Sequence, residues 1–296
     1  MYGDLDSSEL IVEESSKADI VCHWANCSHE ASANAIVKGL SSRSTPGYMI
    51  HTSSTGILCI NDVLRCSSGI PAGKVYDDWD NVDEVTSLPD EAPHRNVDKI
   101  VLAAGEAGSS VKTAIVCPPT IYGPGRGPDN TYSDQWYLMA KGVIQRGKGF
   151  RVGDGDNKWT YVHIADLSNL FLHLVEAAAT GGGNATWGKK GYYFAEDGEY
   201  VWGDIAQKIA QEAHKQGLIK SADVDSLTVD QVNEVTPSYA PRWALNSRCR
   251  AIRARKLFGW TPKGDSIEKL LPSIVKEEAK KIGVIKGHAV HAAGDA

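Results

Sequence analysis

Three short apolar runs, separated by segments with a helical pattern, restrict the fold of this chain more than any other feature. The runs lie at residues 19–25, 48–52 and 111–116, and they are continuous rather than alternating. Continuous apolar runs of this length are typical of parallel strands that are buried on both faces of a sheet. Because helical segments separate them, they predict a doubly wound parallel sheet.

Helical patterns fill the segments between these runs and much of the remaining chain. In each segment, apolar residues recur at the spacing of one helical face. The predicted helices span residues 7–17, 31–40, 93–104, 134–146, 166–178, 201–216 and 266–281. A short aromatic strand is predicted at residues 191–195, and residues 61–93 are predicted to form a long irregular loop beside a site. The regular alternation of strand and helix patterns ends after residue 125. We therefore divide the chain into a sheet domain, residues 1–125, and a smaller mixed α/β region, residues 126–296.

Charge and composition exclude several classes of protein. The 296 residues include 31 Lys and Arg against 37 Asp and Glu, which gives a net charge of −6. A nucleic-acid-binding protein is expected to have the opposite sign, so we expect no nucleic-acid partner. No apolar stretch approaches the roughly 18 residues that a membrane-spanning helix needs, so we expect no membrane segment.

The N-terminus and the cysteines indicate a cytoplasmic protein. The first residues, MYGDLD, contain neither the basic nor the apolar segment of a secretory signal. The cysteines form no CxxC pair, which favours reduced intracellular thiols over disulfides or a zinc site. They are Cys22, Cys27, Cys59, Cys66, Cys117 and Cys249. His163 and Asp166 lie three residues apart, but a pair without a third ligand does not predict a metal site.

One basic cluster lies near the C-terminal end of the chain. Its members are Arg248, Arg250, Arg253, Arg255 and Lys256. We interpret the cluster as a solvated helix whose Ala251, Ala254 and Leu257 pack inward. The alternative, a nucleic-acid contact, lacks the interleaved aromatic residues on which bases stack.

Six sequence blocks together resemble the extended short-chain dehydrogenase/reductase family of the NAD-dependent epimerase/dehydratase type. The blocks are GDL at 3–5, VCHWA at 21–25, HTSST at 51–55, PPTIYGPG at 118–125, YVHIADL at 161–167 and LFGWTP at 257–262. They occur in the order and at the spacing of that family. The resemblance implies that residues 1–125 form a partial NAD(P)-binding Rossmann domain and that residues 126–296 form a substrate-binding region.

The resemblance also implies which residues meet a cofactor and a substrate. The cofactor, NAD or NADP, is expected to contact Asp4, Leu5, Ala25, Thr52, Lys99, Pro118, Pro119 and Thr120. Ser54 is the expected catalytic hydroxyl, and the expected substrate contacts are Ser53, Tyr122 and Trp159. Relative to the family pattern the chain begins near the third strand, so we expect an N-terminally truncated fold. The glycine-rich turn that cradles the pyrophosphate in such folds is absent.

The expected catalytic helix departs from the family pattern. The family has Tyr and Lys four residues apart, so both lie on one helical face. Lys99 stands at the place of the Lys, but Arg95 stands at the place of the Tyr. An arginine stays protonated and cannot pass on a proton, although it can stabilise a developing negative charge. Tyr76 or Tyr122 is the alternative source of a hydroxyl.

Trp159 is a second departure, and it bears on the substrate. Sugar-nucleotide epimerases of this family have an arginine at that place, where it binds the substrate diphosphate. An indole does not replace a guanidinium fork on phosphate oxygens. We therefore expect an NAD(P)-dependent oxidoreductase acting on a small-molecule carbonyl or alcohol. The resemblance implies a homodimer, which is a common assembly in the family. The alternatives are a catalytically impaired NAD(P)-binding or regulatory protein and a nucleoside-diphosphate-sugar epimerase or dehydratase.

Overall fold

The computed structural model describes residues 2–65, 69–71, 73–128 and 131–285. Its strands are β1 (Ile20–His23), β2 (Gly47–Thr52), β3 (Tyr76–Asp77), β4 (Val111–Cys117), β5 (Thr120–Tyr122), β6 (Gly149–Val152), β7 (Lys158–His163), β8 (Tyr192–Phe194), β9 (Gly198–Val201), β10 (Val224–Leu227) and β11 (Cys249–Arg250). Its helices are α1 (Ser8–Lys17), α2 (Glu30–Ser41), α3 (Ile60–Arg65), α4 (Val82–Thr86), α5 (Arg95–Ala104), α6 (Gln135–Arg146), α7 (Ile164–Ala179), α8 (Trp202–Lys215), α9 (Val229–Val235), α10 (Ala240–Ala244), α11 (Ile252–Phe258) and α12 (Ile267–Lys281). Two 3-10 helices, η1 (Thr55–Cys59) and η2 (Gly188–Lys190), complete the described elements.

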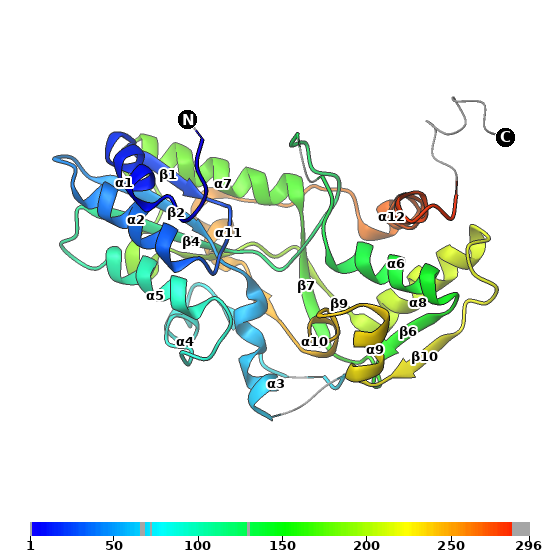
Figure 1. Cartoon of the computed structure of the whole chain (residues 1–296). Helices are drawn as coiled ribbons and strands as arrows, with labels where there is room; N and C mark the ends of the chain where they lie inside the picture. The colour runs from blue at the N-terminus through cyan, green and yellow to red at the C-terminus, as the bar shows by residue number, and fades with distance from the viewer. Residues whose placement is uncertain (1, 66–68, 72, 129–130, 286–296) are drawn as a thin grey trace.

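The four strands β1, β2, β4 and β8 form one parallel sheet in the order β1-β2-β4-β8. Successive residues of β2 and β4 are buried, so both faces of the sheet are covered, as the continuous apolar runs predicted. Helix α7 lies on one side of these strands, and α2 and α5 lie on the other (Figure 1). The expected α/β fold with a doubly wound parallel sheet is therefore confirmed.

Helix α5 illustrates how the sequence sets this packing. Val97 and Val101 are four residues apart and fully buried, so they form the face that packs on the sheet. Lys99 lies on the exposed part of the same helix. Strand β8 comes from beyond residue 125 but pairs with β4, so the sheet draws on both halves of the sequence.

A second layer of helices and short strands surrounds its own apolar core. Strands β5, β7 and β9 form one sheet, and β6 pairs with β10. Helices α6, α8 and α12 pack against one another over these strands. The centre of this second core is aromatic, and it includes Trp136, Phe150, Trp159, Trp202 and Trp243.

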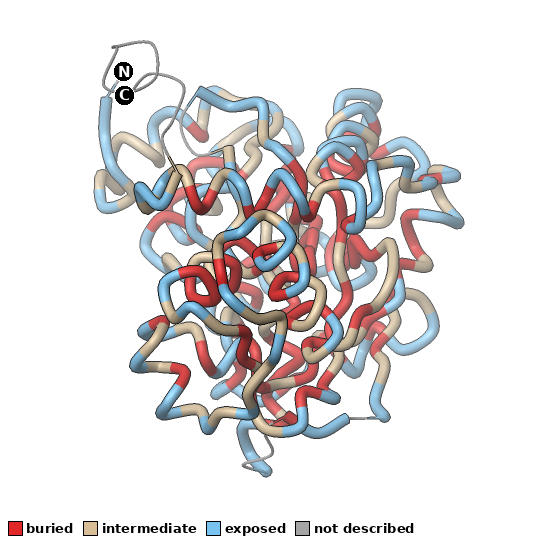
Figure 2. Tube along the Cα trace, turned by 90° about the vertical axis from the view of Figure 1, so that its right-hand side faces the viewer, coloured by how far each residue is buried: buried red, intermediate tan, exposed pale blue. Residues whose placement is uncertain are grey.

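Strand β7 connects the two cores. Trp159, near its start, belongs to the second core, and Val162, near its end, belongs to the core around the parallel sheet. Figure 1 shows β7 running between the two halves of the molecule. Figure 2 shows buried segments gathered in the interior of the molecule and exposed ones at its outline.

The basic cluster differs from the solvated helix that its sequence predicted. Helix α11 begins only at Ile252, so Arg248 and Arg250 precede it. Arg253 is buried, and its Nε donates hydrogen bonds to the carbonyl oxygens of Asp78 and Tyr192 at 2.7 and 3.1 Å. A solvated helix is thus wrong for this residue, because it serves as an internal link between segments.

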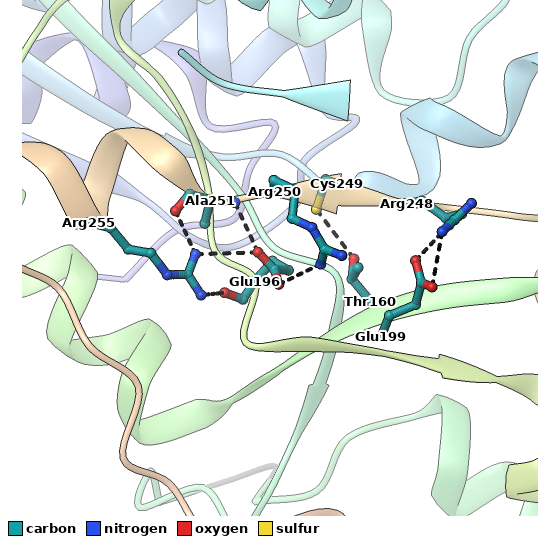
Figure 3. Close-up of polar contacts among 8 residues, drawn as sticks. All are labelled: Thr160, Glu196, Glu199, Arg248, Cys249, Arg250, Ala251 and Arg255. Carbon is teal, nitrogen blue, oxygen red and sulfur yellow. Dashed lines mark hydrogen bonds and ion pairs between the residues drawn. The ribbon is translucent and has the colours of Figure 1, made fainter. Parts of the chain in front are cut away.

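Two glutamates from the chain around β9 bind the other arginines of the cluster (Figure 3). Glu196 accepts hydrogen bonds from Arg250, Arg255 and the backbone N–H of Ala251, at 3.0 to 3.3 Å. Glu199 accepts from Arg248 Nε at 2.6 Å. Three of the five basic side chains of the cluster are therefore bound by carboxylates of the same chain.

Within the described ranges, none of the helices is both long enough and apolar enough to span a bilayer. Cys66 lies outside the described residues. The other five cysteines are free thiols, as expected.

Candidate active site

The segments that follow β1, β2 and β4 meet at the carboxyl edge of the parallel sheet. The backbone N–H of Ser53 donates to the Val116 carbonyl oxygen at 2.8 Å, and that of Thr55 donates to Pro118 at 3.0 Å. The segment containing Ser54 thus lies beside the prolines that follow β4. In open α/β sheets, ligands bind in the crevice outside this edge.

Ser54 lies two residues beyond the end of β2, where it caps the 3-10 helix η1. Its Oγ accepts a hydrogen bond from the backbone N–H of Gly56 at 3.2 Å. The residue is partly exposed, whereas Ser53 before it is buried. Of the two serines, Ser54 is therefore the one that a ligand can reach.

His94 is a residue of this edge that the sequence analysis did not single out. It caps α5, and its carbonyl oxygen accepts the N–H of Asp98 at 3.1 Å. Its φ of 65° lies in the left-handed region, which non-glycine residues seldom adopt. Its Nδ1 lies 2.8 Å from Ser28 Oγ and 3.2 Å from Cys27 Sγ, in the segment after β1.

His94 and Ser54 lie on the same side of Gly56. A Cβ atom added to Gly56 would lie 3.4 Å from His94 Nε2 and 3.5 Å from Ser54 Oγ, so it would be in van der Waals contact with both. The ring nitrogen and the hydroxyl are therefore neighbours on that side of the glycine.

The environment of His94 favours its neutral form. Burial lowers the pKa of His94, and the positive charge of Arg242 in α10 lowers it further. Burial also raises the pKa of the Cys27 thiol. At neutral pH the imidazole and the thiol are both uncharged, so the pair is not a thiolate–imidazolium pair.

A buried polar network lies beneath the edge. His23 Nδ1 and His51 Nδ1, on neighbouring strands, are 2.9 Å apart, and His51 Nε2 is 3.8 Å from Asp98 Oδ1. Tyr192 donates its hydroxyl hydrogen to Asp98 Oδ2 at 3.1 Å. Ser32 on α2 extends the network, since its Oγ lies 3.2 Å from His23 Nε2.

Burial disfavours the charged forms of His51 and Asp98 in this network. Burial, followed by the neighbouring imidazole of His23, lowers the pKa of His51 to about 3. Burial raises the pKa of Asp98 to about 7, although the hydroxyls of Ser53 and Tyr192 favour the ionised carboxylate. Because both groups are removed from water, a neutral pair costs less than an ion pair.

The two predicted residues on α5 are used in other ways. Arg95 is buried; its Nε donates to the carbonyl oxygen of Leu88 at 3.0 Å, and its Nη2 donates to that of Thr86 at 2.7 Å. Lys99 pairs with Asp90 at 2.7 Å on the surface. These contacts occupy both side chains without a ligand.

The expected cofactor residues, Lys99 aside, lie in three places. Those around the ends of β2 and β4 share the edge with Ser54, and they are Thr52, Pro118, Pro119 and Thr120. Of these, Thr120 is buried, with its Oγ1 2.7 Å from the Tyr200 hydroxyl oxygen. Ala25 is exposed in the segment after β1. Asp4 and Leu5 precede α1, and Asp4 accepts the Ser7 hydroxyl hydrogen at 2.8 Å, which lowers the pKa of Asp4.

The remaining predicted residues are buried. Trp159 lies in the second core against Trp202, with ring centroids 6.1 Å apart. Tyr122 donates its hydroxyl hydrogen to the carbonyl oxygen of Asp265 at 2.9 Å. Tyr76 accepts a hydrogen bond from Asn61 at 2.8 Å. The hydroxyls proposed as alternatives to a catalytic tyrosine are therefore engaged within the protein.

The polar groups and prolines of this edge suit the ring-bearing half of a nicotinamide dinucleotide. The partly exposed Ser54 lies beside the turn at Pro118, at the carboxyl ends of β2 and β4. The sequence contains no G-x-x-G-x-x-G turn, so no residue is assigned to the pyrophosphate. In the described part of the chain, no group of three or more His, Cys, Asp or Glu side chains could hold a metal ion.

Comparison with known families identifies the fold and its class. The model of the NAD dependent epimerase/dehydratase family matches residues 2–187. The chain belongs to this family. The resemblance seen in the six sequence blocks is thereby confirmed, and the family is NAD-dependent.

A curated relative and several solved structures are similar to this family member. Oxidase ucsJ from Acremonium sp. is 36% identical over 292 residues, which are 95% of this chain and 84% of the relative. The dTDP-glucose 4,6-dehydratase DesIV from Streptomyces venezuelae, solved with NAD, has a TM-score of 0.64 at 16% identity, covering 96% of this chain and 80% of that one. RMD from Pseudomonas aeruginosa, complexed with NADPH, has a TM-score of 0.58 at 16% identity. The match covers 95% of this chain and 88% of RMD.

These similarities support an oxidoreductase-type function that depends on NAD or NADP. The solved structures confirm the Rossmann-like fold, since their sequence identity is too low to show more than the fold.

Proposed function

We propose that this protein is a cytoplasmic NAD(P)-dependent oxidoreductase that interconverts a small-molecule alcohol and its carbonyl compound. The observation that carries the proposal is Ser54, a partly exposed serine on the carboxyl edge of the sheet, beside the prolines that follow β4. Family membership supplies the class of cofactor.

Some residues of the edge are assigned to the cofactor and others to the substrate. The segment after β1 and the prolines Pro118 and Pro119 hold the nicotinamide half of the dinucleotide, which supplies or accepts a hydride when bound. Ser54 Oγ binds the substrate oxygen and orients its carbon. Residues 1–125, completed by β8, bind the cofactor, and residues 126–296 supply the substrate region. A homodimer is part of this proposal.

Dinucleotide binding is the first test. Purified protein is titrated with NADH and with NADPH while nicotinamide fluorescence is followed, and we expect binding of at least one of them in the micromolar range. Variant Ser54→Ala should bind the dinucleotide as well as the wild type does, because its hydroxyl is assigned to the substrate. Absence of binding up to millimolar concentration would reject the function.

Turnover is the second test. We expect NAD(P)H oxidation with members of an aldehyde and ketone panel, or NAD(P) reduction with the corresponding alcohols. Loss of one hydrogen bond to the substrate oxygen predicts a 10- to 100-fold lower kcat/KM for Ser54→Ala, taking about 1.5–3 kcal/mol for the bond. Equal kcat/KM values for the wild type and Ser54→Ala would show that Ser54 does not bind the substrate oxygen.

One observation favours a second function, binding of a dinucleotide without catalysis. Arg95, at the place where the family pattern has its tyrosine, is held by two backbone carbonyl oxygens. Dinucleotide binding combined with no turnover across the panel would support this alternative. Protection from heat by a uridine diphosphate sugar would instead indicate an epimerase, which the burial of Trp159 disfavours.

A further inference from the structure

We propose that His94 is a catalytic base, which takes the proton from the substrate hydroxyl when an alcohol is oxidised. The proposal rests on the oxidoreductase function above and adds the group that moves the proton. It also assigns a positioning role to Ser28, which holds the His94 ring.

The two nitrogens of His94 face different surroundings. Nε2 lies on the same side of Gly56 as Ser54 Oγ, since a Cβ atom added to that glycine would lie 3.4 Å from the one and 3.5 Å from the other. Nδ1 lies 2.8 Å from Ser28 Oγ. One nitrogen is therefore close to the hydroxyl assigned to the substrate oxygen, and the other reaches a hydroxyl on an exposed residue.

Ser28 fixes the tautomer that a base requires. When Nδ1–H donates to Ser28 Oγ, Nε2 is left with a lone pair directed toward the substrate site. Ser28 is itself held in place, because Asn96 Nδ2 donates to its carbonyl oxygen at 3.4 Å and to Glu30 Oε1 at 2.7 Å. A fixed hydroxyl gives the imidazole one preferred orientation.

The charges around His94 keep it ready to accept a proton at neutral pH. Cys27 faces it from the segment after β1, Arg242 from α10, and His51 from β2. The thiol is protonated and His51 is neutral, and burial, which raises the pKa of Asp98 one turn further along α5 to about 7, weakens the negative charge of that carboxyl. An uncharged imidazole is a general base, whereas an imidazolium is not.

The reaction balances with the dinucleotide as the oxidant. The O–H bond of the alcohol breaks and its proton passes to His94 Nε2. The C–H bond breaks and its hydrogen leaves with the electron pair as hydride to the oxidised dinucleotide, so a C=O bond forms. The imidazolium then releases a proton from Nδ1 to Ser28 Oγ and on to water. Reduction of a carbonyl compound uses the same steps in reverse.

Three variants test the assignment. His94→Asn removes the base but keeps a residue that tolerates positive φ. Ser28→Ala removes the hydroxyl, and Ser28→Thr retains it. His214→Gln is the matched control, because His214 is exposed on α8 and its Nδ1 contacts only its own segment, at Ile219.

Kinetics give the first readout. For His94→Asn we expect kcat for alcohol oxidation to fall 10²- to 10⁴-fold with an unchanged Kd for the dinucleotide, and the acidic limb of the pH profile to disappear. Ser28→Ala should lower kcat less and shift that limb, and Ser28→Thr should restore it. Equal kcat values for His94→Asn and His214→Gln overturn the proposal, while failure of the wild type to bind dinucleotide rejects the oxidoreductase function instead.

Spectroscopy of the ring gives a readout that does not depend on turnover. Nitrogen-15 NMR of the histidine side chains, assigned with His94→Asn, should show His94 neutral at pH 6.5 and protonated on Nδ1. In Ser28→Ala that tautomer should lose its preference. A His94 signal that is protonated on Nε2, or on both nitrogens at pH 6.5, overturns the proposal.

Discussion

Arg95 stands at a catalytic position of the family pattern, and in this structure its side chain links segments of the fold. Its spacing from Lys99 matches the family pair, but its guanidinium is buried under the carbonyl oxygens of Thr86 and Leu88. His94, one residue earlier, has no signal in composition or periodicity. Its orientation depends on a positive φ and on contacts with a segment 66 residues away, which no local pattern records.

Substitution of Arg95 should therefore affect stability. Arg95→Ala leaves two buried carbonyl oxygens without their donors, so we expect the free energy of unfolding to fall by about 2–3 kcal/mol. Lys99→Ala is the control, because its exposed pair with Asp90 contributes at most about 1 kcal/mol. Urea denaturation of both variants measures the difference. Similar losses would show that the buried hydrogen bonds contribute little.

The pKa of Asp98 predicts how stability responds to pH. Its folded value, about 7, lies above its ordinary value of 3.8, so the folded state retains a proton that the unfolded state releases. This contribution is fully present below pH 3.8 and is lost as the pH rises toward 7, by about 1.4 kcal/mol for each pH unit. In Asp98→Asn, which has no carboxyl at this position, this fall in stability with rising pH should not occur.

Comparison at two pH values tests this sign. Between pH 5 and pH 7, the free energy of unfolding of Asp98→Asn should rise relative to that of the wild type by roughly 2–3 kcal/mol. The measurement is urea denaturation at each pH. If Asp98 instead formed an ion pair with His51, the difference would be absent or reversed.

At the scale of elements, long periodic segments were predictable and short ones were not. The predicted helices at 134–146 and 201–216 correspond to α6 and α8 within one residue at each end. Residues 61–93, predicted as a loop, contain most of α3 and all of β3 and α4, each of six residues or fewer. Segments this short have too few residues to show a period, and tertiary contacts decide their conformation.

The segment that precedes α11 owes its position to side-chain contacts. Glu196 is buried and accepts hydrogen bonds from Arg250, Arg255 and the N–H of Ala251 (Figure 3). Glu196→Ala removes this carboxylate and leaves the buried N–H of Ala251 without its acceptor, so we expect a loss of roughly 2–3 kcal/mol in the free energy of unfolding. Glu13→Ala, which breaks an exposed pair in α1, should leave the free energy of unfolding nearly unchanged. Equal Tm values for the two variants would contradict the assignment.

At the scale of the whole molecule, the parallel sheet was predictable because its strands are continuous apolar runs. The second core was not, because its strands are short and their partners lie far apart in sequence, as in the pairing of β6 with β10. The active-site edge was predictable only in part. Ser54 follows directly from the end of a predicted strand, but the meeting of Ser28, His94 and Ser54 requires three separate segments to fold first.

The passage of β7 through both cores predicts one unfolding transition. Trp159 and Val162 lie on the same six-residue strand but in different cores, so one core cannot lose its packing without disturbing the other. In urea, tryptophan fluorescence and far-UV circular dichroism should give coincident midpoints. Two separated midpoints would show that the cores unfold independently.

The left-handed backbone conformation at His94 lowers the stability of the fold, while the histidine side chain is the one proposed for catalysis. Glycine would adopt this φ without steric cost, while a residue with a side chain loses about 1–2 kcal/mol there. In a library of variants selected only for resistance to heat, glycine at position 94 should therefore be enriched. Selection of the same library for turnover should instead enrich histidine at this position. The difference in stability between the glycine and histidine proteins would then measure the stability that the catalytic residue costs.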